Sequence, residues 1–130
     1  MNAVGQLVLV AEDDVTVRRV VATVLKFNGF DILEARNGLE AVQLYASYAG
    51  DIALVITDLD MPVMDGGEAI HRMRVVNSGV RVLVMTGGTL AERPSDCHLL
   101  PKPFTPHQLI EAVHAVIDGF PATARGNRTV

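Results

Sequence analysis

The sequence predicts an α/β fold in which one doubly wound parallel sheet is covered by helices on both faces. Short apolar or β-branched runs bounded by turn residues recur along the chain, and segments with helical spacing separate them. The hydrophobic content of 49% is high, as expected where a sheet is buried on both sides. The length of 130 residues is also the size of a single domain.

The first predicted strand, Gln6 to Ala11, leads into three consecutive acids at positions 12–14. A helix is expected next, because apolar residues then recur at the spacing of one helical face. These residues are Val17, Val20, Val21, Val24 and Leu25. Asp14 is expected to cap the start of this helix with its side chain, and Asn28-Gly29 to end it in a left-handed conformation.

The second strand is predicted from Phe30 to Ala35, and a helix follows after Asn37-Gly38. The apolar side of that helix carries Val42, Tyr45 and Ala46. The central strand, Ile52 to Thr57, places Asp58 at its carboxyl end, where open α/β sheets hold their ligand sites. Pro62 then stops any regular continuation.

A third helix is predicted after Gly66-Gly67, with Ile70 and Met73 on its inner side. The fourth strand, Val80 to Met85, ends at Thr86 and two glycines. Residues 90–93 offer at most one helical turn before a proline at position 94. The helix between the fourth and fifth strands is therefore expected to be shortened or missing.

His98 to Leu100 is predicted as a short fifth strand that leads into Pro101-Lys102-Pro103-Phe104. The last helix begins at Thr105, with Pro106 in its first position and Gln108 completing a capping box. Its buried stripe consists of Leu109, Ile110, Val113, Val116 and Ile117. Residues 1–118 are predicted to form one domain, and residues 119–130 a flexible C-terminal tail.

Parallel strands joined by right-handed crossovers, in the flavodoxin-like order 2-1-3-4-5, are the expected arrangement for five such strands. That arrangement brings polar side chains from several strand ends to one edge of the sheet. They are Glu12, Asp13, Asp58, Thr86 and Lys102.

Three carboxylates about 4 Å apart repel one another by about 4 kcal/mol per pair at an effective dielectric constant of about 20. A Mg²⁺ ion removes this repulsion, because it favours sites made of a few carboxylates, waters and phosphate oxygens. The whole set suits phosphoryl transfer, with Asp58 as the nucleophile and Lys102 and the Thr86 hydroxyl binding phosphoryl oxygens.

Each of these residues also has a purely structural explanation. Glu12 and Asp13 could be solvated turn acids, and Asp65-Gly66 a simple turn. Cys97 is expected to be a small buried or half-buried residue. The histidines lack metal-ligand spacing and are expected to be solvated or capping; they are His71, His98, His107 and His114.

Four motifs occur in the order LVAEDD, VITDLDMPVMDG, VLVMTGG and PKPF. With them, the sequence resembles the receiver domain of two-component response regulators from residue 6 to about residue 118. The resemblance implies that Asp58 is the phosphoacceptor, that Asp13 is a direct Mg²⁺ ligand and that Glu12 is the second acid of the metal site.

The same resemblance implies roles at three further positions. The backbone carbonyl of Asp60 would complete the metal site, Thr86 would be the switch hydroxyl, and Lys102 would bind the phosphoryl group. The bond between Lys102 and Pro103 would be cis, as is usual in this family. The implied partner is a sensor or hybrid histidine kinase, or a histidine phosphotransfer protein.

The sequence departs from the family pattern at three places. Leu99 stands where an aromatic switch residue is usual, three positions before Lys102. Only 15 residues separate Thr86 from Lys102, fewer than the family normally has. Asp60 adds an acid two residues after Asp58.

Two other functions remain open. Asp58-Leu59-Asp60 fits the DxD signature of haloacid-dehalogenase-like phosphatases, in which the second aspartate is the acid/base. The other is a receiver-like adaptor that binds partners without phosphorylation. The leucine at position 99 and the shortened fourth helix favour it, whereas the complete set of acids, threonine and lysine argues against it.

Composition excludes several classes of protein. A net charge of −4 and an aromatic content of 5% argue against direct binding to nucleic acid. No apolar run is long enough to span a bilayer, so no membrane insertion is expected. A single cysteine excludes an internal disulfide, and a cytoplasmic location is predicted.

Overall fold

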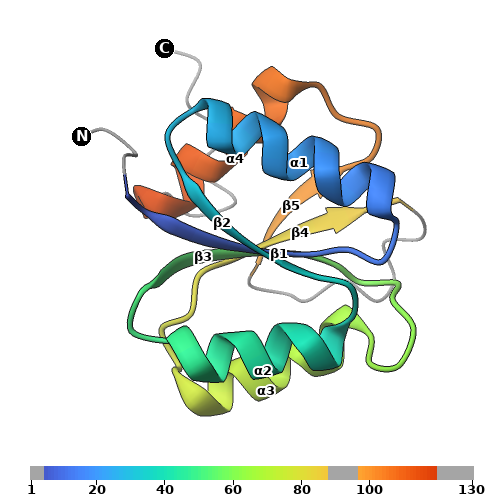
Figure 1. Cartoon of the computed structure of the whole chain (residues 1–130), viewed down its shortest axis with the longest axis vertical. Coiled ribbons are helices and arrows are strands. Elements are labelled where there is room, and N and C mark those ends of the chain that lie inside the picture. The colour runs from blue at the N-terminus through green and yellow to red at the C-terminus, as the bar shows by residue number, and fades with distance from the viewer. Residues whose placement is uncertain (1–4, 88–96, 120–130) are drawn as a thin grey trace.

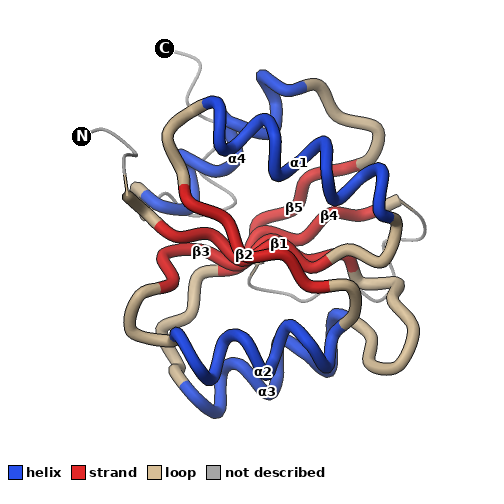
Figure 2. The backbone as a smooth tube through the Cα atoms, viewed as in Figure 1, coloured by secondary structure: helices blue, strands red, loops and turns tan. Residues whose placement is uncertain are grey.

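The computed structural model describes residues 5–87 and 97–119, which form three layers. A five-stranded sheet lies in the middle, with α1 and α4 on one face and α2 and α3 on the other (Figures 1 and 2). The strands are β1 Leu7–Ala11, β2 Asp31–Ala35, β3 Ile52–Asp58, β4 Val82–Thr86 and β5 His98–Pro101. The helices are α1 Val15–Phe27, α2 Gly38–Tyr48, α3 Gly66–Val76 and α4 Pro106–Ile117.

The strand order is β2-β1-β3-β4-β5 and every pair is parallel, which confirms the predicted topology. The central strand is one residue longer than predicted and includes Asp58, whereas β1, β2 and β4 begin one or two residues later than predicted. The prediction of a shortened helix falls on residues 90–93, which lie outside the described part of the chain. Most of the predicted tail, residues 120–130, also lies outside it.

Each face of the sheet buries its own apolar cluster. Alternate residues of the central strand supply both, with Leu54 and Ile56 facing α1 and α4, and Val55 facing α2 and α3. This explains why the sequence of β3 is a continuous run of apolar residues and does not alternate between apolar and polar residues. Within residues 5–87 and 97–119, no helix combines the length and apolar character needed to cross a membrane.

The helix ends confirm the predicted caps. The Asp14 side chain accepts hydrogen bonds from the backbone N–H groups of Thr16 and Val17. Gly29 follows the end of α1 with a φ of 92°, as predicted for a left-handed cap. At the start of α4, Thr105 and Gln108 form the predicted capping box.

Two glycines hold the loop between β3 and α3 against the rest of the molecule. A Cβ atom added at Gly66 would overlap with the backbone carbonyl of Asp58, and one added at Gly38 would overlap with the carbonyl of Met64. The backbone N–H of Gly66 also donates to the carbonyl of Leu59 at 2.9 Å. Only a residue without Cβ allows this close packing, so Gly66 fixes the position of the chain immediately after Asp58.

We expect Gly66→Ala to lower the free energy of unfolding by about 1–3 kcal/mol, because the added methyl group forces the backbone at Asp58 to move. Urea denaturation followed by circular dichroism measures this. Gly67→Ala is the matched control on the same helix, since its Cβ would meet only the end of the Asp65 side chain at 3.4 Å. Equal stability of the two variants would contradict the role assigned to Gly66.

Candidate functional site

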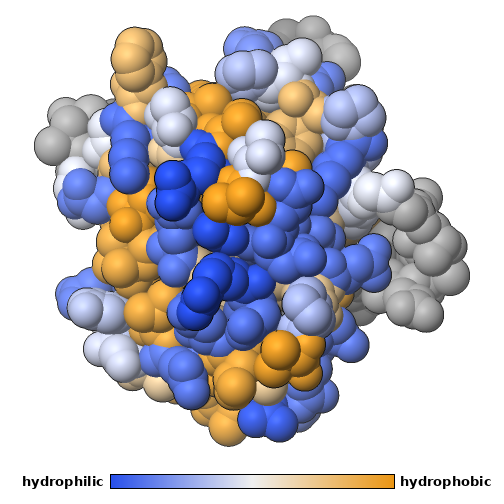
Figure 3. Space-filling view, turned by 45° about the vertical axis from the view of Figure 1, so that its right-hand side comes forward, coloured by the Kyte–Doolittle hydropathy of each residue, from blue (hydrophilic) through white to orange (hydrophobic). Residues whose placement is uncertain are grey.

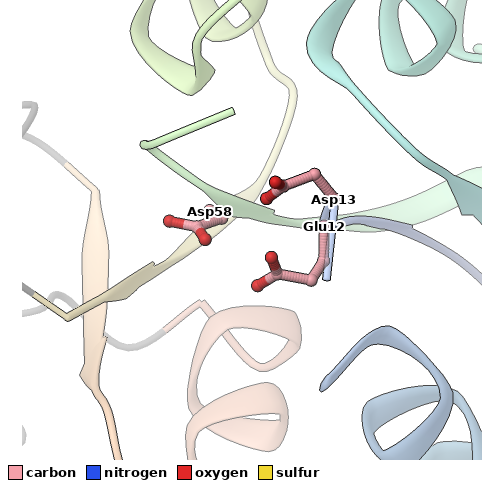
Figure 4. A group of neighbouring side chains, drawn as sticks. All are labelled: Glu12, Asp13 and Asp58. Atoms are coloured by element: carbon pink, nitrogen blue, oxygen red, sulfur yellow. The ribbon is translucent and has the colours of Figure 1, made fainter. Parts of the chain in front are cut away.

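Three acids meet at the carboxyl edge of the sheet. Glu12 and Asp13 follow β1, and Asp58 ends β3, the strand paired beside it. One carboxylate oxygen from each lies within 4.8 Å of the others, and Figure 4 shows the carboxylates of Glu12 and Asp13 extending toward the side on which Asp58 lies. Glu12 and Asp58 are 1% and 6% exposed, whereas Asp13 is exposed to solvent. The structure thus brings together the acids that the sequence placed on two strand ends.

Lys102 bridges two of these acids. Its Nζ atom lies 2.9 Å from Glu12 Oε1 and 2.9 Å from Asp58 Oδ2. The backbone N–H of Lys102 donates to the carbonyl of Thr86 at 2.6 Å, so β5 carries the lysine to the same edge of the sheet. The bond between Lys102 and Pro103 is cis, as predicted.

The pKa values of the bridged groups reflect their burial and their contacts. Burial raises the pKa of Glu12, although the hydrogen bonds from Lys102 and from the backbone of Asp14 oppose this. Partial burial alone would lower the pKa of Lys102, but its hydrogen bonds to Asp58 and Glu12 and their charges raise it overall. Lys102 therefore stays protonated at neutral pH, where its charge offsets that of the buried acids.

The Asp58 carboxylate is held in one orientation by two donors. The backbone N–H of Asp60 donates to Oδ1 at 3.1 Å, and Lys102 Nζ donates to Oδ2 at 2.9 Å. Each oxygen retains capacity to accept a further contact. A buried carboxylate held in this way is suited to act as an oriented nucleophile or as a metal ligand.

Thr86 and Asp60 occupy different environments. Thr86 is the last residue of β4, is 7% exposed, and lies one strand away from Asp58 at the same edge. Asp60 is exposed, and its carboxylate does not belong to the cluster of three acids. Its backbone contact with Asp58 is therefore its link to the site.

The donor set fits a hard divalent cation. Three carboxylates within 4.8 Å of one another supply only oxygen ligands. Mg²⁺ and Ca²⁺ prefer oxygen ligands, whereas softer metals prefer nitrogen and sulfur. The exposure of Asp13 leaves one side open to water and to phosphate oxygens. The space-filling view that brings the right-hand side of Figure 1 forward shows hydrophilic residues gathered across the middle of this face (Figure 3).

The other conspicuous side chains lie outside this cluster. His71, His107 and His114 are exposed on helices, as predicted. The same prediction is wrong for His98, the first residue of β5, which is half-buried and whose Nε2 is enclosed without a hydrogen-bond partner among the described residues. Cys97 is buried, as predicted. Within residues 5–87 and 97–119, no histidine or cysteine joins a group of three or more metal-ligand side chains.

The sequence interpretation missed Arg18, which is 7% exposed. Its guanidinium donates to the backbone carbonyl of Glu12 at 2.8 Å and to Glu34 Oε1 at 3.0 Å. A signal for its burial was available, because position 18 precedes Val21, Ala22 and Leu25 at helical spacing. The prediction used only the apolar positions of this helix, so it assigned no place to an arginine among them.

A family model described as the response regulator receiver domain matches residues 8–114. The chain is 36% identical to a transcriptional regulatory protein, the CpxR homolog of Haemophilus influenzae, over 84% of this chain and 49% of that protein. It is 28% identical to the sensor kinase CckA of Brucella abortus over 85% of this chain and 12% of that protein. The chain thus spans half or less of the length of these relatives.

The chain is also similar in structure to solved proteins, among them a receiver domain. The receiver domain of a hybrid histidine kinase CckA superposes with a TM-score of 0.76 at 32% identity, covering 85% of this chain and 98% of that one. The chemotaxis protein CheY4 of Vibrio cholerae gives a TM-score of 0.78 at 26% identity, covering 89% and 99%.

Without divalent cations, we expect Lys102→Met to lower the free energy of unfolding by about 3 kcal/mol. This is the lower end of the range for breaking a buried ion pair, because the Lys102 side chain is 25% exposed. The reason is that Glu12 and Asp58 would be left buried without an opposing charge. Adding Mg²⁺ is expected to restore most of the loss.

Arg72→Met is the matched control, since it removes an ion pair with Glu68 whose two side chains are about half exposed. Its expected cost is about 0.5 kcal/mol or less. Chemical denaturation with and without Mg²⁺ measures both variants. A Lys102 variant as stable as the control would show that the bridge contributes nothing.

Proposed function

Because the chain belongs to the response regulator receiver domain family of two-component signalling, we propose that it accepts a phosphoryl group from a phosphohistidine partner onto Asp58. One observation supports this most directly: the Asp58 carboxylate is buried, oriented by two donors and flanked by two acids and a lysine. We assign this function to residues 1–118 and place it in the cytoplasm.

The proposed reaction is a direct transfer to a carboxylate oxygen. An Asp58 oxygen attacks phosphorus, a P–O bond forms, and the P–N bond to the partner's histidine breaks. The imidazole nitrogen keeps the electron pair of the broken bond and takes up a proton from solvent. A carboxylate nucleophile needs no general base, and none of the described groups around Asp58 is required to act as one.

The surrounding side chains would stabilise the charge on the transferred group. Lys102, whose Nζ lies 2.9 Å from Asp58 Oδ2, is close enough to bind an oxygen of a phosphoryl group attached there. Glu12, Asp13, Asp58 and the carbonyl of Asp60 would hold Mg²⁺, which when bound supplies positive charge to the phosphoryl oxygens. The Thr86 hydroxyl would donate to a third oxygen.

The conformational response of this chain to phosphorylation should not involve the movement of an aromatic ring, because Leu99 occupies the position of the usual aromatic residue. Leu99 is half-buried, packs against the apolar cluster under α2 and α3, and is paired with Val84 in the sheet. It therefore shares a face with Val84 and Thr86 but offers no polar group for a moved threonine. We infer that the phosphoryl group biases the surface near β4 and β5 through Thr86 and packing alone.

The phosphatase alternative is weaker. Its acid/base would be Asp60, yet the Asp60 carboxylate is exposed and lies outside the acid cluster. The adaptor alternative does not explain why two buried carboxylates and a lysine lie together at one strand edge, since apolar residues there would often be at least as stable as such a buried ionic group.

An apolar groove next to the acceptor suits the donor protein. It has a volume of about 360 Å³ and lies between α1 and the segment after β5. Its lining consists of Thr16, Val17, Val20, Val21, Lys102, Pro103 and Phe104. Because Lys102 both lines the groove and contacts Asp58, a helix seated there would hold its phosphohistidine near the acceptor. We propose that the histidine-bearing helix of the kinase or phosphotransfer protein docks in this groove.

Incubation with Mg²⁺ and acetyl phosphate is expected to add one phosphoryl group, measured by intact-protein mass spectrometry. The adduct should be labile to hydroxylamine, as an acyl phosphate is, and absent from Asp58→Asn. Asp60→Asn is the matched control and should still be phosphorylated, because its carboxylate lies outside the cluster.

Two results would count against the proposal. Catalytic release of phosphate from small esters, lost in Asp60→Asn, would favour the phosphatase. No gain of mass from acetyl phosphate or from a cognate kinase would favour the adaptor.

We expect Val20→Asp to slow transfer from the cognate histidine kinase by at least about tenfold, since it places a charge in an apolar contact. Val75→Asp is the control, because Val75 is also exposed but lies on α3, across the sheet. Phosphorylation of both variants by acetyl phosphate should match the wild type. Equal rates of kinase transfer to the two variants would exclude the groove as the docking site.

A further inference from the structure

Arg18 reaches from α1 to two neighbouring strands. Its Nη1 donates to the backbone carbonyl of Glu12 at 2.8 Å, beyond the end of β1, and its Nε donates to Glu34 Oε1 on β2 at 3.0 Å. The Arg18 side chain is 8% exposed, and the Glu34 side chain is 28% exposed. A buried arginine that donates in two directions fixes the relative position of the groups it joins.

The carbonyl that Arg18 holds belongs to the peptide unit between Glu12 and Asp13. The N–H of Glu12 donates to the carbonyl of Ala35 at 3.0 Å, so the backbone of Glu12 is held on both sides. The N–H of Asp14 donates to Glu12 Oε2 at 3.1 Å, which orients the carboxylate from the same short segment. Because Asp13 is exposed, the direction of its carboxylate depends mainly on the backbone that carries it.

We propose that Arg18 is a positioning residue for the metal site: it fixes the Glu12–Asp13 peptide unit so that both carboxylates converge with that of Asp58. This inference rests on the proposed function, since it assumes that these acids bind Mg²⁺. Groups that orient metal ligands from behind contribute to metal affinity without touching the ion. Arg18 acts in this way through the backbone.

The direction in which Mg²⁺ affinity changes when Arg18 is replaced distinguishes a positioning role from a simple effect of its charge. A cation near a Mg²⁺ site repels the ion, so removal of the Arg18 charge alone would strengthen Mg²⁺ binding. Loss of positioning would weaken it. We expect Arg18→Met to raise the Mg²⁺ dissociation constant about tenfold, the lower end of the range for groups that orient metal ligands.

The test is a titration of the full chain with MgCl₂, followed by the amide NMR signals of Glu12, Asp13 and Asp14. The thermal stability of the same samples is measured in parallel. Arg19→Met is the matched control, because Arg19 is the next residue, is 69% exposed, and approaches the same Glu34 oxygen at 3.5 Å. The control is expected to bind Mg²⁺ as the wild type does.

Arg18→Lys is the second variant, and it tests the positioning role if Arg18→Met does not fold. A lysine keeps the charge but cannot place two planar donors on Glu12 and Glu34 together. We expect its Mg²⁺ affinity to fall below that of the wild type.

The outcomes distinguish a failure of the role proposed for Arg18 from a failure of the proposed function. Weaker Mg²⁺ binding by folded Arg18→Met or Arg18→Lys, with Arg19→Met unchanged, supports the proposal. If the folded Arg18 variants are destabilised but bind Mg²⁺ as tightly as the wild type, Arg18 has only a structural role and the proposal fails. If the wild type itself does not bind Mg²⁺ at millimolar concentration, the proposed function fails, and the inference with it.

Discussion

The site depends on one ammonium group shared by two buried carboxylates from different strands. Lys102 bridges Glu12 after β1 and Asp58 at the end of β3, and it arrives from beyond the far edge strand β5. A bridge of this kind forms only if all three strand ends are level, because each contact is 2.9 Å long. Parallel pairing provides this, since Ala11 lies opposite Thr57 and Thr86 opposite Pro101. The ion pairs of Lys102 therefore require this particular sheet register. The acids tolerate burial only because the fold brings a cation to them.

The backbone around the site is held from several sides. Asp14 caps α1 and also orients Glu12, and α1 in turn carries Arg18 back to the Glu12 carbonyl. On the other side, α3 begins at Gly66, in direct contact with the backbone of Asp58. The starts of α1 and α3 thus stabilise the strand ends that precede them, those of β1 and β3. This arrangement explains how a site made of residues far apart in the sequence is ordered before any ligand binds.

Much of this could be predicted from the sequence, because apolar runs and breakers report directly on a sheet buried on both faces. The strand order, the capping residues and the convergence of Glu12, Asp13 and Asp58 followed from that pattern. Two features escaped it. Arg18 is a polar residue in an apolar stripe, and a pattern of apolar positions alone does not mark such a residue as buried. The close packing of Gly66 depends on the tertiary path of a loop, which local residue preferences do not encode.

The loop between β3 and α3 has an unusual consequence for how this domain can vary. Surface loops generally accept insertions at little thermodynamic cost, because closure entropy grows slowly with length. The two ends of this loop are joined, because the N–H of Gly66 donates to the carbonyl of Leu59, and Met64 near its C-terminal end lies against Gly38. An inserted residue that displaced either contact would disturb Asp58 or the start of α2. The segment of residues 59–65 should therefore keep a constant length in functional variants, and it is a poor place to insert a tag or a sensor module.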